Sequence, residues 1–155
     1  VIGVAVLVLV AALVAAAALT VATWVAPAAA RTPATDYQAD IASWTNVQRE
    51  KHELTPLRRQ ACVQQYAVRQ ARKMAAREEL FHQDLQRVLR ACNLQSAGEN
   101  VAYGFDDGRS VVVDGWMESP PHRANILHAG FRLLGAGARL GDDGLWYAVQ
   151  VFGRR

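Results

Sequence analysis

Gly98–Leu127 reads GENVAYGFDDGRSVVVDGWMESPPHRANIL, and the interpretation of the whole chain depends on this stretch. It contains two glutamates and a histidine, Glu99, Glu118 and His122, among glycines, prolines and serines that shape tight backbone. A second histidine, His82, lies upstream. Two histidines and two glutamates can hold a divalent metal or transfer protons, so these four residues are the candidate site.

The N-terminal part of the chain differs sharply in composition from the rest. Residues 1–30 contain no Asp, Glu, Lys, Arg or His. We expect an apolar helix over 1–26, because ~20 apolar residues span a bilayer. Ala28-Ala29-Ala30 offers a cleavage signal, so the two main alternatives are an uncleaved signal anchor and a cleaved signal peptide, with a buried core helix as the third. A linker over 27–36 then leads to a domain over 37–155, which either main alternative places outside the cytoplasm.

Charge and cysteine content agree with an exported domain. The net charge is +3, and Lys and Arg are mixed with Asp and Glu, so nothing indicates nucleic-acid binding. The chain has two cysteines, Cys62 and Cys92. In an exported protein such a pair favours a disulfide, with two buried thiols as the alternative.

Periodicity and turn residues predict a series of helices followed by strands. We expect helices over 37–52, from Thr55-Pro56 to about 79, over 84–92 and over 110–118, and strands over 99–105, 133–140 and 145–152. In the second helix Ala67, Ala71 and Ala75 form a stripe of small residues that permits close approach of another element. Helices before strands indicate the α+β class.

Four segments resemble one known family. They are Gly98-Glu99-Asn100, Trp116–Leu127, Gly135-Ala136-Gly137 and Tyr147–Gly153, and together they look like the bacterial branch of the CAP superfamily. This superfamily groups cysteine-rich secretory proteins, antigen five and plant pathogenesis-related proteins. The resemblance extends over about residues 40–155.

The resemblance implies an α-β-α sandwich, in which a central antiparallel sheet lies between helix layers. It also implies a cleft lined by His82, Glu99, Glu118 and His122, with the two histidines as ligands of a divalent metal, zinc in the first place. Glu118 lies one residue nearer the tryptophan than the glutamate of the animal pattern.

The family does not define one activity, because one fold hosts many functions. The first hypothesis is an extracellular, monomeric module that binds a lipid or other cell-envelope ligand, with membrane contact through the N-terminal segment if it is uncleaved. The second is a metal-assisted hydrolase. The third is a structural or partner-binding envelope protein with a vestigial cleft. The sequence favours a binding protein over an enzyme.

Overall fold

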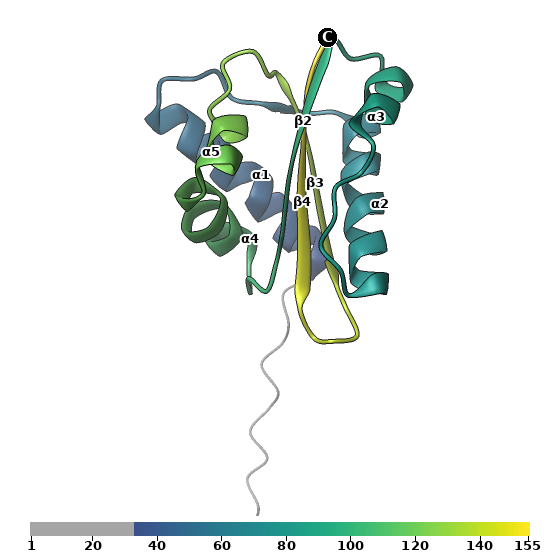
Figure 1. The fold of residues 1–155 in the computed structure, drawn as a ribbon. Helices are drawn as coiled ribbons and strands as arrows, with labels where there is room; N and C mark the ends of the chain where they lie inside the picture. Colours follow the sequence, from purple (N-terminus) through teal and green to yellow (C-terminus); the bar gives the residue numbers. More distant parts are fainter. Residues whose placement is uncertain (1–32) are drawn as a thin grey trace, which may run out of the picture. The chain divides into compact units, whose positions relative to one another are not determined.

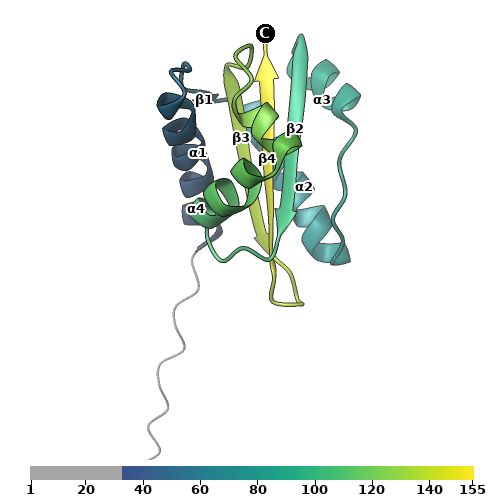
Figure 2. The same ribbon diagram turned by 60° about the vertical axis from the view of Figure 1, so that its left-hand side comes forward.

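The computed structural model describes residues 33–155, so the expected apolar helix over 1–26 lies outside the described residues. The fold is α+β, as predicted, with a four-stranded sheet between two helix layers (Figures 1 and 2). The strands are β1 (Arg58–Arg59), β2 (Ser96–Tyr103), β3 (Leu133–Leu140) and β4 (Trp146–Arg154). Their order is β1-β3-β4-β2, and only β1 runs parallel to its neighbour. Among residues 33–155, no helix is both long and apolar enough to cross a bilayer.

One layer consists of α2 (Ala61–Arg77) and α3 (Leu85–Cys92). The predicted Cys62–Cys92 disulfide is present and joins the two helices, with a Cα–Cα distance of 5.6 Å. The small-residue stripe of α2 packs against β3, where a Cβ added to Gly135 would lie 2.5 Å from the Val63 carbonyl oxygen. Glycine in β3 therefore allows the helix backbone to approach the sheet directly.

The other layer consists of α1 (Ala34–Lys51), α4 (Gly108–Ser110) and α5 (Pro120–Ile126). Between α4 and α5 the chain continues as a π-helical segment, Val111–Gly115, and a 3-10 turn, Trp116–Glu118. Trp116 is 1% exposed, and its indole N–H donates to the carbonyl of Val101 in β2 at 3.3 Å. This contact fixes the loop that precedes α5 against the sheet.

The predicted helix start at Thr55-Pro56 is wrong. α2 begins at Ala61, where the Gln60 side chain accepts the Val63 N–H at 2.7 Å. Residues 57–59 are instead extended, because the Asn46 amide binds both the N–H and the carbonyl of Leu57 at 2.8 and 3.0 Å. Arg58 and Arg59 then pair with β3. Tertiary pairing thus overrides the local Thr-Pro signal.

Three other elements differ from the prediction. β2 begins at Ser96, three residues before the expected start, because it pairs with β4 along its whole length. The helix expected over 110–118 is divided into α4, the π-helical segment and the 3-10 turn. The break falls at Gly115, where helix propensity is poor. α1 starts at Ala34, so it includes three residues that were expected to belong to the linker.

Candidate functional site

His82 and Glu99 form the centre of the candidate site. His82 lies in the segment between α2 and α3, and Glu99 lies in β2, which brings the two side chains together. The distance from His82 Nδ1 to Glu99 Oε1 is 2.8 Å, and the two side chains are 60% and 1% exposed. An ionised carboxylate can only accept hydrogen bonds, so Nδ1 carries the hydrogen. In the neutral form of His82, Nε2 is therefore the nitrogen that keeps a lone pair for a ligand.

The Glu99 carboxylate is held by two further donors, both from Gln83. The backbone N–H of Gln83 donates to Oε1 at 3.1 Å, and the Gln83 side-chain amide donates to Oε2. A buried carboxylate needs such partners, because burial without them is costly. The three hydrogen bonds thus fix the carboxylate in the position from which it orients His82.

His122 enters the site from the first turn of α5. Pro120 and Pro121 begin this helix, as proline favours the first helical positions, and Ser119 precedes it. The Ser119 hydroxyl does not cap the helix backbone; it lies 2.9 Å from His122 Nδ1. Burial, and secondly the charge of nearby His82, lower the pKa of His122 below its ordinary value of 6.5. His122 is therefore neutral at pH 7 and electrostatically coupled to His82.

A buried amide cluster ties α5 to the sheet beneath these histidines. Asn100, which follows Glu99, donates to the His122 carbonyl at 3.0 Å and to Gln150 Oε1 at 2.9 Å. Asn125 donates to the Glu99 carbonyl at 3.1 Å and to Asn100 Oδ1 at 2.8 Å. Gln150 in turn donates to the Thr45 hydroxyl of α1. Polar networks that are fully satisfied in this way hold a site rigidly.

The sequence analysis assigned no role to Gln83 or Gln150. One signal was available for Gln150, which is a polar residue inside an otherwise apolar strand and is the register partner of Asn100. Gln83 carries no comparable signal, because its role depends on Glu99 lying opposite it in the fold.

Glu118 is exposed, and it lines a cavity whose lining includes neither His82 nor His122. This cavity measures about 350 Å³, and its other lining residues are Met117, Pro120, Arg123, Ala124 and Leu127. The participation of Glu118 in the cleft stays a prediction. Within residues 33–155, no group of three or more His, Cys, Asp or Glu has the geometry to hold a metal ion. The donors that the described residues offer at this site are the two histidine Nε2 atoms.

Comparisons of the sequence and of the structure with known proteins indicate the same family. The model of the cysteine-rich secretory protein family, CAP, matches residues 43–152. The structure of an extracellular protein containing an SCP domain, from Bacillus anthracis, is 27% identical with a TM-score of 0.68, over 79% of this chain and 41% of that one. An outer surface protein from Borrelia burgdorferi shares the fold at 22% identity, with a TM-score of 0.68 over 77% of this chain and 96% of that one.

A third relative is the uncharacterized protein YkwD of Bacillus subtilis, 29% identical over 109 residues, which are 65% of this chain and 42% of that protein. The chain thus spans less than half the length of the two Bacillus relatives. Since the family model extends over more than half of the chain and the fold agrees with it, this chain belongs to the cysteine-rich secretory protein (CAP) family.

Proposed function

We propose that this chain is an exported CAP-domain protein that binds a lipid or other amphipathic cell-envelope ligand without transforming it. Export is supported by the Cys62–Cys92 disulfide, since disulfides persist in oxidising compartments, and by the Bacillus anthracis relative, which is described as extracellular. The chain acts in this proposal as a monomer.

The cavity beside α5 carries the proposal. Four of its lining side chains are apolar, Met117, Pro120, Ala124 and Leu127, and two are charged, Glu118 and Arg123. Small-molecule sites combine apolar walls with a few polar groups in this way. The cavity includes residues of the same short helix that carries His122. An amphipathic ligand would place its apolar part here and its polar part toward the histidines.

The two histidines would also hold a divalent metal, zinc in the first place, through their Nε2 atoms. The donor set fits this role because Glu99 and Ser119 engage the two Nδ1 atoms, which is how histidine ligands are commonly oriented. Two protein ligands leave the rest of the coordination shell to water or to the envelope ligand, so binding would be weak. The ion would supply a positive charge that attracts an anionic headgroup.

Hydrolysis is the less favoured function because of Glu99. A general base must reach a water molecule, whereas the Glu99 side chain is 1% exposed and already accepts hydrogen bonds from His82 and Gln83. Glu118 lines the apolar cavity instead of contacting either histidine. The arrangement therefore favours binding over catalysis.

Native mass spectrometry of the full chain in a nonionic detergent, mixed with a bacterial lipid extract, tests the proposal. Wild type should carry a lipid adduct, and Ala124→Trp should lose it, because the indole would fill the cavity. Ala91→Trp is the matched control, since Ala91 is also exposed but lies on α3, across the sheet. Absence of an adduct on wild type, or an adduct that persists in Ala124→Trp, would overturn the proposal.

A further inference from the structure

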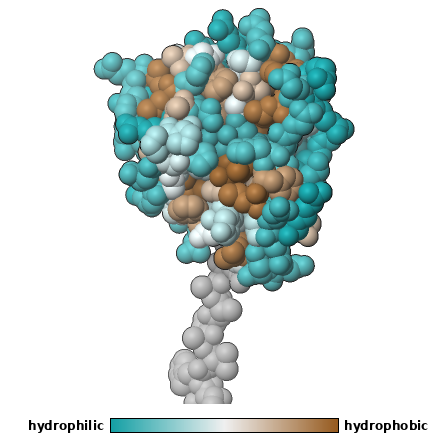
Figure 3. Space-filling model, viewed as in Figure 1, coloured by the Kyte–Doolittle hydropathy of each residue, from teal (hydrophilic) through white to brown (hydrophobic). Residues whose placement is uncertain are grey.

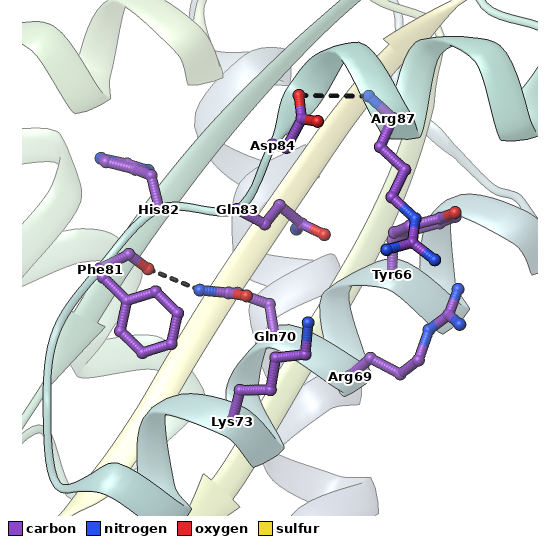
Figure 4. Close-up of a pocket in the computed structure, with 9 residues that line it drawn as sticks. All are labelled: Tyr66, Arg69, Gln70, Lys73, Phe81, His82, Gln83, Asp84 and Arg87. Atoms are coloured by element: carbon purple, nitrogen blue, oxygen red, sulfur yellow. Dashed lines mark hydrogen bonds between the residues drawn. The ribbon is translucent and has the colours of Figure 1, made fainter.

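A second cavity, of about 320 Å³, lies between α2, residues 81–84 and α3, on the face of the sheet opposite α5. Its lining residues are Tyr66, Arg69, Gln70, Lys73, Phe81, His82, Gln83, Asp84 and Arg87 (Figure 4). Three of them, Arg69, Lys73 and Arg87, are cations. In Figure 3 the edge of the molecule where α2 and α3 lie is mainly hydrophilic. The cavity is thus a cationic hollow in a polar helix layer.

The three cations have no carboxylate partner within the described chain. The salt bridges found among residues 33–155 are His82–Glu99 and Arg109–Asp114. Asp84 is the one carboxylate that lines the cavity, and it accepts the backbone N–H groups of Gln86 and Arg87 at 2.9 and 3.3 Å as the N-cap of α3. Asp84 therefore offsets one of the three positive charges without pairing with any of them, and the lining stays net positive.

The walls of the cavity are held in place. The Arg69 guanidinium lies over the Tyr66 ring, 4.4 Å from its centroid, and this stacking leaves its edge N–H groups free to donate. The buried Gln70 amide donates to the Phe81 carbonyl at 2.6 Å, which fixes residues 81–84 against α2. Tyr66, Arg69 and Lys73 lie on one face of α2 because they are three and four residues apart.

We propose that this cavity binds the phosphate group of an anionic ligand, either a soluble phosphate or the headgroup of an anionic lipid. Guanidinium groups match phosphate oxygens bidentately, and Lys73 adds a point charge. The Tyr66 and Phe81 rings offer apolar surface to the part of the ligand that adjoins the phosphate. This site does not rest on the lipid binding proposed for the cavity beside α5, with which it shares no residue. His82 lines this second cavity and also belongs to the cleft.

Isothermal calorimetry on the full chain in a nonionic detergent, at constant ionic strength set with sodium chloride, tests the site. The probes are inorganic phosphate and glycerophosphoglycerol, the deacylated headgroup of phosphatidylglycerol. Arg69→Gln/Arg87→Gln should weaken binding of the accepted probe about tenfold or more, since each lost charge-assisted hydrogen bond has a large effect. Unchanged thermal melting of this variant would show that it folds.

Arg72→Gln/Arg90→Gln is the matched control. It also removes one positive charge from α2 and one from α3, both on exposed residues that do not line the cavity. This control should bind like wild type. Preference for inorganic phosphate would identify a soluble phosphate, and preference for glycerophosphoglycerol a lipid headgroup. Binding of neither probe by wild type, or equal weakening in both double variants, would overturn the proposal.

Discussion

The Glu99 carboxylate accepts the Nδ1 hydrogen of His82 across 2.8 Å, although Glu99 is buried in β2 and His82 is largely exposed. A buried group therefore sets the tautomer and the orientation of a surface imidazole. This pair makes His82 a ligand with a fixed Nε2 lone pair, whereas an exposed histidine alone would sample several rotamers.

Glu99→Gln should destabilise the protein by about 1–3 kcal/mol, because the new amide N–H₂ would face N–H donors from His82 or Gln83 and leave buried groups unpaired. Urea unfolding monitored by tryptophan fluorescence would measure this loss. Glu118→Gln makes the same chemical change on an exposed side chain and should stay within ~0.5 kcal/mol of wild type. Equal stability of Glu99→Gln and wild type would show that the Glu99 contacts are weak.

Zinc binding should depend on both histidines of the cleft. Calorimetric titration of zinc should show weak binding at pH 7.5 and loss of most of the affinity in His82→Ala and in His122→Ala. Binding should also fade at pH 5.5, because a protonated imidazole cannot ligate. His52→Ala, at the C-terminal end of α1, is the control and should bind like wild type. If either cleft variant keeps wild-type affinity, the two histidines do not share a metal.

Removal of the disulfide should cost about 3–4 kcal/mol, the chain-entropy value for a loop closed across a sequence separation of 30. Cys62→Ser/Cys92→Ser should therefore unfold at lower urea concentration than wild type. A reductant should shift the wild-type curve toward that of the variant and leave the variant unchanged. Coincident curves for oxidised wild type and the variant would mean that packing between α2 and α3 suffices without the bond.

Arg49 connects α1 to the chain that follows α5, and its removal should be severely destabilising. The fully buried guanidinium donates to the carbonyls of Thr55, Ile126 and His128 at 2.8 to 3.0 Å. Arg49→Met would leave these carbonyls without their donor and should cost about 3 kcal/mol or more. Lys51→Met, on the exposed side of the same helix, should have little effect in the same urea experiment. A small loss in Arg49→Met would contradict this role.

Local patterns in the sequence were sufficient where neighbouring residues determine the structure. The bounds of β3 were predicted because Leu133 and Leu140 enclose an apolar run that ends at the Gly141–Gly144 turn. The disulfide was predicted because the chain has two cysteines and the composition indicates export. These features need no knowledge of what lies opposite them in the fold.

Long-range contacts explain what the sequence could not predict. The Thr55-Pro56 signal failed because residues 58–59 pair with β3, about 75 residues away in the chain. The role of Gln83 comes from its contacts with Glu99, 16 residues away in the chain, which no local pattern encodes. Glu118 lies in the 3-10 turn that precedes α5, where sequence reasoning expected a regular helix.

The pKa of His122 should lie below 6.5, chiefly because of burial and secondly because of the charge of His82. NMR titration of the histidine ring protons, in the presence of a chelator, would measure it. His82→Ala should raise this pKa but leave it below 6.5, since burial remains. A value at or above 6.5 in wild type would contradict the burial of this ring in solution.

The lowered pKa of His122 determines how the free energy of unfolding changes with pH. Between the folded-state pKa of His122 and 6.5, the unfolded chain binds more protons than the folded protein does. His122 therefore contributes nothing at pH 7.5, where both states are neutral, and it lowers the free energy of unfolding as the pH falls through this window. Urea unfolding at pH 7.5 and pH 5.0 should show a larger loss for wild type than for His122→Gln, which cannot titrate. Equal losses in the two proteins would show that protonation of His122 does not oppose folding.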